Sequence, residues 1–311
     1  MLQQTTVTAV VPRYRRFLDR WPTIEALAGA PLDDVLHEWQ GLGYYARARN
    51  LHRCAQVVVH EWRGKFPATE HALLTLPGIG AYTAAAVAAF AFNRRAVPLD
   101  ANVERVVARL MALEEPLATS RPAMTAFAST LIPSRRAGDA AQALMELGAT
   151  VCAIRRPQCL ICPLADLCRA RARKMTDRIP AKAPRAVTPL RHAAVYWLEQ
   201  GDGRVLLRRR PEDGLFGGMM GLPMTAWAES PWPESAVRRS APWKATWKAV
   251  PGTVTWGVTH FRIALTVYRA RLGKEPPDLV GVWADPGDFG GYALPTMMKK
   301  AVRHALTAKA S

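Results

Sequence analysis

One stretch decides the fold, Leu76-Pro-Gly-Ile-Gly-Ala-Tyr-Thr-Ala-Ala-Ala-Val87, together with Leu99-Asp-Ala-Asn-Val103 further along. The glycines Gly78 and Gly80 allow a tight turn and a close approach by an outside group. The first amides of the following helix have no partner within it, so they can bind an anion. The carboxylate of Asp100 precedes a second helix, expected from about Asn102. An anion site beside a carboxylate predicts chemistry on a nucleic-acid backbone or sugar. The alternatives are an ordinary helix connector and a carboxylate that only caps its helix.

Composition narrows the class of protein. A chain of 311 residues is long enough for two domains. Its 42 basic and 25 acidic residues leave a net charge of +17, which favours a polyanionic partner such as DNA, RNA or an anionic membrane surface. No apolar run reaches membrane-spanning length, and the N-terminus lacks an export signal. We therefore expect no membrane association and a cytoplasmic, DNA-associated protein.

Helical patterns dominate residues 1 to 170. Pro31-Leu-Asp-Asp34 begins a helix that Gly41 ends. Helices are also predicted over 102–113 and 142–151. A further apolar stripe at helical spacing comprises Leu51, Cys54, Ala55, Val58 and Trp62. Cys54 is expected to be a plain core residue.

After residue 190 the apolar period changes to two. Strands are predicted at 193–198 and 205–207 around the hairpin turn Gly201-Asp-Gly203, with further strands over 253–268 and a closing helix over 297–306. The sequence thus predicts an all-α domain over 1–172, a basic, proline-containing linker over 173–190, and an α+β domain over 191–311.

Two adjacent aromatics lie among basic residues in Gly41-Leu-Gly-Tyr-Tyr-Ala-Arg-Ala-Arg-Asn50. Aromatic side chains beside cations suit base stacking or wedging with phosphate anchoring. Tyr44, nearer the glycine turn, is the wedge candidate, whereas Tyr45 is expected to pack in the core.

Four cysteines follow one another in a C-x6-C-x2-C-x5-C run: Cys152, Cys159, Cys162 and Cys168. In a chain without an export signal such a run favours a metal centre over disulfides. One compact, asymmetric loop with four thiolates favours an iron–sulfur cluster. Zinc is the alternative.

Taken in order, these motifs and the initial Met1-Leu-Gln-Gln-Thr5 resemble the MutY-type adenine DNA glycosylases, and the resemblance covers essentially the whole chain. That family combines a helix-hairpin-helix glycosylase domain, a [4Fe–4S] cluster and a C-terminal Nudix-like domain. The resemblance implies a monomeric base-excision repair enzyme. Its substrate would be double-stranded DNA with adenine opposite 8-oxoguanine or guanine.

The resemblance also implies roles for individual residues. Asp100 would be the carboxylate beside the scissile sugar, with Tyr82 and Asn102 at active-site positions and Gln142 in the adenine pocket. Gly78 and Gly80 would grip the DNA backbone, and the four cysteines would hold the cluster. The positions that would probe the opposite strand and the oxidised guanine are Gln4, Thr5, Leu42, Tyr44, Thr259 and His260.

The sequence departs from the family pattern at two places, and each departure leads to an expectation about activity. Val258 and Thr259 replace the usual phenylalanine and serine before His260, which predicts weaker damage recognition by this loop. The family's general acid is a glutamate two positions before the methionine at which this chain begins. Because general acid catalysis contributes about a hundred- to ten-thousandfold, we expect this chain to be a slow glycosylase, and we expect an in-frame glutamate upstream of Met1. Glu104 and Glu146 do not occupy a matching position.

Three other functions compete with adenine excision. An endonuclease III-like lyase needs a lysine where this chain has Tyr82, which cannot form a Schiff base. A DNA-binding protein that finds the lesion without cutting remains open, because the glutamate is missing. Nucleotide pyrophosphohydrolysis needs a glutamate-rich metal-binding helix. Residues 224–240 offer only Glu229 and Glu234, so this function is excluded.

Overall fold

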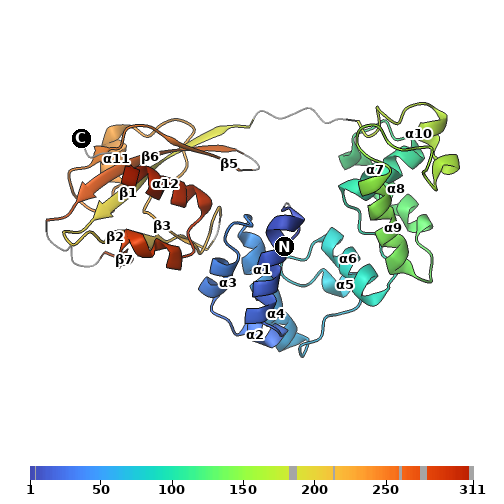
Figure 1. Cartoon of the computed structure of the whole chain (residues 1–311), viewed down its shortest axis with the longest axis horizontal. Coiled ribbons are helices and arrows are strands. Elements are labelled where there is room, and N and C mark those ends of the chain that lie inside the picture. Colours follow the sequence, from blue (N-terminus) through green and yellow to red (C-terminus); the bar gives the residue numbers. More distant parts are fainter. Residues whose placement is uncertain (4, 182–187, 213, 259–260, 274–278, 308–311) are drawn as a thin grey trace. The chain divides into compact units, whose positions relative to one another are not determined.

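A computed structural model describes residues 1–3, 5–181, 188–212, 214–258, 261–273 and 279–307 (Figure 1). The chain divides into two compact units. The terminal unit comprises Met1–His52 and Ala186–Ser311, and the central unit comprises Arg53–Arg185. This division is not the one expected from the sequence, since the first helices pack with the C-terminal part. The domain limits 1–172, 173–190 and 191–311 remain predictions.

The terminal unit begins with short helices that share one aromatic core. They are α1 (Val7–Arg20), α2 (Ile24–Ala28), α3 (Leu32–Glu38) and the start of α4 (Ala46–Glu61). The helix predicted from Pro31 is therefore α3, with Pro31 at its N-cap. Their core contains Phe17, Trp21 and Trp39, whose rings meet edge to face. Met219 and Ala293, far along the chain, complete this core.

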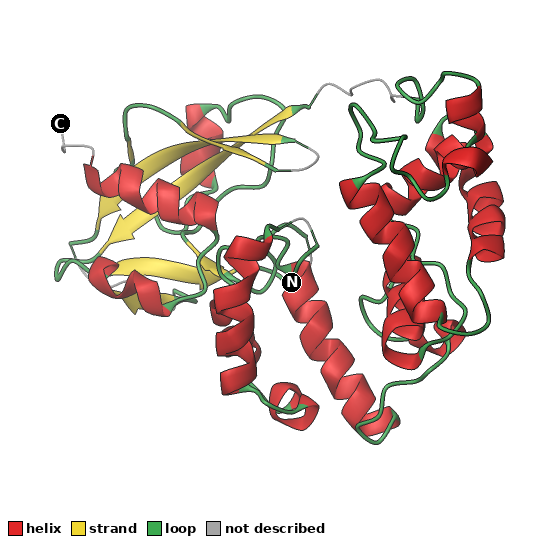
Figure 2. Ribbon diagram, turned by 45° about the vertical axis from the view of Figure 1, so that its right-hand side comes forward, coloured by secondary structure: helices red, strands yellow, loops and turns green. Residues whose placement is uncertain are grey.

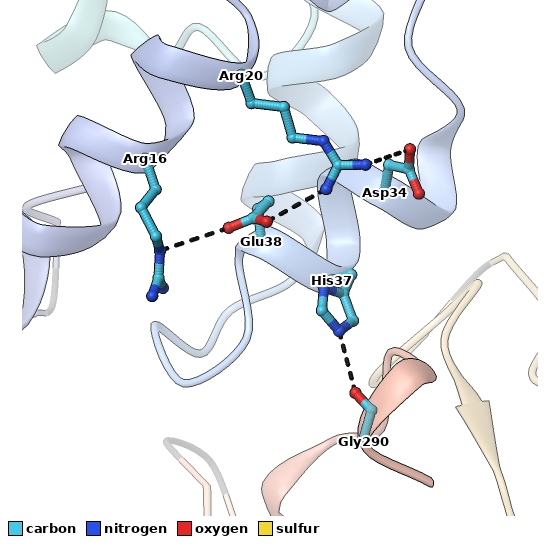
Figure 3. A network of polar contacts seen from close by, with 6 residues as sticks. All are labelled: Arg16, Arg20, Asp34, His37, Glu38 and Gly290. Carbon is cyan, nitrogen blue, oxygen red and sulfur yellow. Dashed lines mark hydrogen bonds and ion pairs between the residues drawn. The ribbon is translucent and has the colours of Figure 1, made fainter. Parts of the chain in front are cut away.

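Polar contacts join α1, α3 and the C-terminal part of the same unit (Figure 3). Arg20 pairs with Asp34 at 2.5 Å and with Glu38 at 3.2 Å, and Arg16 lies 3.7 Å from Glu38. A ring nitrogen of His37 lies 3.1 Å from the carbonyl oxygen of Gly290. Exposed pairs of this kind each contribute about 0–1 kcal/mol, so they orient the helices more than they stabilise them.

A mixed sheet forms the rest of the terminal unit (Figure 2). Its strands are β1 (Leu190–Glu199), β2 (Val205–Arg209), β3 (Met220–Gly221), β4 (Lys248–Ala249), β5 (Val254–Gly257), β6 (Arg262–Arg271) and β7 (Val282–Ala284). The order is β3-β2-β1-β6-β4, with β5 also paired to β6 and β7 to β2. β1 and β6 run parallel, from Leu190 opposite Arg262 to Glu199 opposite Arg271. β1 and β2 are antiparallel, which confirms the predicted hairpin.

Both faces of β1 are buried, and each face packs in a different hydrophobic core. Ala193, Val195 and Trp197 pack with the methionines of α12 (Thr296–Thr307), the predicted closing helix. The intervening residues Ala194, Tyr196 and Leu198 pack with Val237 of α11 (Glu234–Arg239). A short 3-10 helix, η2 (Pro286–Gly291), precedes α12. The expected fold class, a helical part followed by an α+β part, is confirmed.

Helices make up the central unit. After the remainder of α4 come α5 (Glu70–Leu73), α6 (Ala81–Phe92), α7 (Ala101–Met111), α8 (Leu117–Leu131), α9 (Ala137–Thr150), η1 (Ala165–Leu167) and α10 (Arg169–Ala172). The second helix of the opening stretch is α7, which packs against α8, α9 and α10. Its predicted apolar face is buried at Val103, Val106 and Leu110. This burial fixes the direction in which the start of α7 points.

Three sequence expectations need correction. Leu51 is 36% exposed, because it lies near the end of the part of α4 that belongs to the terminal unit, whereas Cys54 is buried as predicted. α9 begins at Ala137, ahead of the predicted Gln142, since its small first residues show no apolar period. Within the expected linker one residue packs against α7: Ile179 is 2% exposed, and its carbonyl accepts a hydrogen bond from Arg109.

No helix in the described part of the chain combines the length and apolar character needed to cross a membrane.

Candidate active site and cysteine loop

The turn at Gly78 and Gly80 opens the first turn of α6 to the outside. Gly78 has φ +74°, in the left-handed region that favours glycine. Gly80 is the N-cap, and among the described residues no side chain caps this helix end. A Cβ on Gly80 would meet no described atom within 4 Å. Helix-start amides facing open space can receive a phosphate, as the sequence predicts.

Asp100 is both a helix cap and a carboxylate fixed in orientation. Its Oδ1 accepts hydrogen bonds from the amides of Asn102 (3.0 Å) and Val103 (2.8 Å) at the start of α7. Its Oδ2 accepts a third, from the side-chain amide of Asn102, at 3.1 Å. Capping alone uses one oxygen. The hydrogen bond from the Asn102 side chain to Oδ2 fixes the second oxygen as well, and with it the plane of the carboxylate.

Tyr82 shares the electrostatic surroundings of this carboxylate. Burial raises the pKa of the Tyr82 hydroxyl, and the charge of Asp100 raises it further. Asp100 and Asn102 are in direct contact, and Tyr82 lies near enough to feel the charge of Asp100. The phenol stays neutral near neutral pH and can act there as a hydrogen-bond donor.

Arg105, which the sequence reasoning missed, continues the network from Asn102. Its Nη2 donates to Asn102 Oδ1 at 2.9 Å and also to the Gly148 carbonyl of α9, and its Nε donates to the Cys152 carbonyl at 2.8 Å. Burial is the main cause that lowers the pKa of its guanidinium. Asn102 is thereby held from both sides, and the start of α7 is connected to the cysteine loop.

Gly148 allows α9 to approach α7 at this point. A Cβ built on it would lie 2.7 Å from the Cβ of Asn102 and 2.8 Å from its carbonyl oxygen. Such distances are too short for any side chain, so a glycine is required here. The glycine shows no turn signal in the sequence, because it lies inside a helix.

Glu104 is a second carboxylate near Asp100. It pairs with Arg121 of α8 at 3.2 Å. Burial raises the pKa of its carboxyl, Arg121 opposes this effect, and the Asp100 charge adds to it. Arg121 also donates to the Leu99 carbonyl at 3.2 Å. Together these contacts brace the segment that carries Asp100.

The four cysteines surround one small cavity. A space of about 20 Å³ is lined by Cys152, Cys159, Cys162 and Cys168. Burial raises the pKa of the Cys159 thiol, and its three cysteine neighbours raise it further. Among the described residues, no group of three or more histidine, cysteine or acidic side chains could hold a single metal ion. The four cysteines thus line one common cavity.

Arg109 of α7 donates hydrogen bonds to the start of the cysteine loop. Its Nη1 donates to Cys152 Sγ at 3.2 Å and to the Ala153 carbonyl at 2.7 Å, and its Nη2 donates to the Ile154 carbonyl at 3.2 Å. The guanidinium thus places a hydrogen-bond donor beside a cysteine sulfur of the loop. Thiolates are the species that bind iron or zinc.

Gln142 lies on α9 with its side chain exposed. The hydrogen bond described for its side-chain amide goes to Gly138 on its own helix, at 3.3 Å. This contact leaves Gln142 outside the network of Asp100, Asn102 and Arg105.

The lesion-side candidates belong to the terminal unit, and the structure describes three of them. Thr5 Oγ1 donates to the Leu42 carbonyl at 3.2 Å, while the Leu42 side chain is only 3% exposed. Tyr44 is 46% exposed, with φ +48°. Tyr45 is buried, as predicted, and its hydroxyl accepts a hydrogen bond from the Gly41 amide. Gln4, Thr259 and His260 lie outside the described residues.

Comparison with known proteins agrees with this arrangement. Residues 1–130 match the HhH-GPD superfamily of base excision DNA repair proteins, and residues 194–304 match the NUDIX domain. A solved thermostable thymine-DNA glycosylase is 31% identical, with a TM-score of 0.50, over 55% of this chain and 80% of its own. Fold and site define a DNA glycosylase of the helix-hairpin-helix class with a Nudix-like domain.

The relatives narrow the class to one family. The adenine DNA glycosylase of Homo sapiens is 33% identical over 97% of this chain and 66% of its own length. That of Rattus norvegicus is 32% identical over 97% of this chain and 69% of its own. The chain belongs to the adenine DNA glycosylase family. It spans about two thirds of the length of these relatives.

Proposed function

We propose that this chain hydrolyses the N-glycosidic bond of adenine in double-stranded DNA, at sites where adenine lies opposite 8-oxoguanine or guanine. The observation that carries the proposal is the Asp100 carboxylate at the start of α7. Two backbone amides and the Asn102 side chain fix it, and Tyr82 lies in its field. The family of named adenine DNA glycosylases supports the choice of base.

The chemistry requires a negative group held beside the sugar. As the base leaves, positive charge develops on the sugar in an oxocarbenium-like transition state, as in other glycoside hydrolyses. A carboxylate that is already oriented stabilises this charge without reorganising. Asp100 supplies the charge, and Asn102 keeps it oriented. Arg105 keeps Asn102 oriented in turn.

Contacts with the DNA follow from the same elements. The open start of α6 at Gly78 and Gly80 would bind a backbone phosphate. The target adenine must leave the stack to reach Asp100, and Gln142 would contact it once it is flipped. On the opposite strand, Tyr44 would wedge beside the oxidised guanine, with the other contacts from Gln4, Thr5, Thr259 and His260. The buried Leu42 would support this surface from within the core and not touch the base.

The cysteine loop would hold a [4Fe–4S] cluster. Supporting this are the shared cavity of the four thiols and the Arg109 donor aimed at Cys152 Sγ. When bound, the cluster would tie the loop together through four iron–thiolate bonds.

The cluster proposal is tested by purification without oxygen. The expected product is brown and contains about four irons and four sulfides per chain. Stoichiometric zinc in a colourless protein would contradict it.

The activity proposal is tested with Asp100→Asn in a single-turnover assay of adenine release. Asparagine caps a helix as well as aspartate does, so the fold should persist while the charge is lost. The rate should fall by about a hundred- to a thousandfold. The exposed Asp19→Asn on α1 is the control and should keep the unsubstituted rate. An Asp100→Asn enzyme of undiminished rate would leave Asp100 as a cap only. Lesion binding without any adenine release by the unsubstituted chain would favour the non-cutting DNA-binding function.

A further inference from the structure

Arg47, in the first turn of α4, holds two separate stretches of backbone together. Its Nη1 donates to the carbonyl of Met1 at 3.5 Å and to the carbonyl of Gln3. Its Nη2 donates to the carbonyls of Leu42 at 3.2 Å and Gly43 at 3.4 Å. One guanidinium therefore joins the stretch that carries Thr5 to the turn that carries Tyr44. The planar guanidinium carries several N–H donors with fixed directions, so one side chain can reach all of these backbone carbonyls.

Two aromatic rings complete the surroundings of this guanidinium. The Arg47 Cζ atom lies 5.5 Å from the Trp39 ring and 5.2 Å from the Tyr44 ring. Trp39 is buried, and its indole N–H donates to the Gly43 carbonyl at 3.1 Å. Arg47 thus connects the Tyr44 ring to a fixed part of the core.

No carboxylate pairs with Arg47 in the described part of the chain. Its Nε is buried, with no hydrogen-bond partner among the described residues. Burial lowers the pKa of the guanidinium. Arg47 is half-buried, and removing part of a charge's hydration without an opposite charge beside it costs free energy, which argues for a role other than stability.

The turn that Arg47 contacts has an unusual backbone conformation. Gly41, Gly43 and Tyr44 have φ values of +84°, +68° and +48°. A non-glycine residue in the left-handed region is strained, and such strain persists only where the surroundings enforce it. The Arg47 guanidinium provides part of that enforcement, since it holds the two carbonyls just before Tyr44 and lies over the Tyr44 ring.

We propose that Arg47 is a positioning residue that sets the Tyr44 ring and the Thr5 stretch for reading the base opposite the target adenine. The proposal rests on the proposed function and deepens it, because it assigns the lesion preference to a half-buried cation that acts through Tyr44 and Thr5 and not through a DNA contact of its own.

The test compares Arg47→Ala with the control Arg53→Ala, an exposed arginine further along α4. Arg47→Ala should lower the preference for adenine opposite 8-oxoguanine over adenine opposite guanine by about tenfold, comparable to losing one stacking aromatic. The slope of DNA affinity against salt should stay unchanged. A phosphate contact would instead reduce that slope by about one and leave the preference intact, and this outcome would overturn the proposal.

A double-mutant cycle with Tyr44→Ala separates positioning from a general loss of structure. If Arg47 acts through Tyr44, the double variant should lose little more preference than either single variant. Independent, additive losses would contradict the proposal.

Hydrogen exchange provides a readout that needs no activity. Amides in 41–44 should exchange faster in Arg47→Ala and in Arg47→Lys, because the hydrogen bonds from Arg47 to the Leu42 and Gly43 carbonyls are lost or weakened. Exchange in Arg53→Ala should not change. Unchanged exchange in both Arg47 variants would overturn the positioning role even if the chain excises adenine. Faster exchange in a chain that releases no adenine would instead count against the proposed function alone.

Discussion

The start of α7 and the turn before α4 are each organised by one arginine, the buried Arg105 and the half-buried Arg47, but in different ways. At α7, Arg105 donates to acceptors in α9 and the cysteine loop, so the contacts join one helix to another helix and to the loop that follows it. Before α4, Arg47 donates to carbonyls of a turn and of the chain's first residues. The first arrangement fixes a half-buried carboxylate, whereas the second supports a ring that is nearly half exposed.

This difference matches the two tasks of the proposed function. Charge stabilisation needs a carboxylate whose position does not change during the reaction. Reading an opposite base needs an aromatic ring that solvent and DNA can reach. Each of the following predictions tests one side of the comparison, and the largest expected effect comes first.

Of these three predictions, Arg105→Ala should produce the largest change. It would remove the side-chain donor to the Gly148 carbonyl and to the Asn102 side chain, and it would leave the Cys152 carbonyl with Arg109 as its side-chain donor. Unsatisfied buried acceptors should lower the free energy of unfolding by about 3 kcal/mol. Adenine release should slow by about ten- to a hundredfold, since Asn102 is no longer oriented. Denaturant unfolding and single-turnover rates measure the two effects, with Arg53→Ala as the control. Normal values for both would show that the network is incidental.

Tyr44→Ala should affect selectivity and leave stability intact. Loss of a stacking ring costs about 1–3 kcal/mol, so the preference for 8-oxoguanine opposite adenine should fall accordingly. The melting temperature should stay close to that of the unsubstituted protein, because the ring is largely outside the core. Tyr14→Ala, an exposed tyrosine of α1, is the matched control. A collapse of thermal stability with normal discrimination in the remaining folded protein would make Tyr44 a core residue.

The smallest effect is expected for Arg155→Ala combined with Arg156→Ala, two exposed arginines of the cysteine loop. If both face phosphate, DNA binding should weaken and its salt slope should fall by about two. The adjacent exposed pair Arg238 and Arg239 of α11, replaced in the same way, is the control. A slope equal to that of the unsubstituted protein would identify Arg155 and Arg156 as ordinary surface charges.

Local patterns in the sequence predicted much of this arrangement. The glycine-flanked turn before an alanine-rich helix indicated the open start of α6, and the structure has Gly80 as its N-cap. Asp100 could be read as a cap or as a functional carboxylate. The geometry makes it a cap and a doubly held carboxylate at once. Tyr45 as a core residue and the hairpin at 201–203 were also predicted correctly.

The sequence by itself determined the elements and the chemistry that each short motif can support, because helix caps, turns and apolar periods depend on neighbouring residues. Only the tertiary structure decided what holds those motifs in place. Arg105 meets Cys152 across 47 positions of sequence, and Arg47 meets Met1 across 46. In both cases the acceptor is a backbone carbonyl, which every residue possesses. Because residue type does not show which backbone carbonyl will accept a hydrogen bond, these contacts can be identified only from the folded structure.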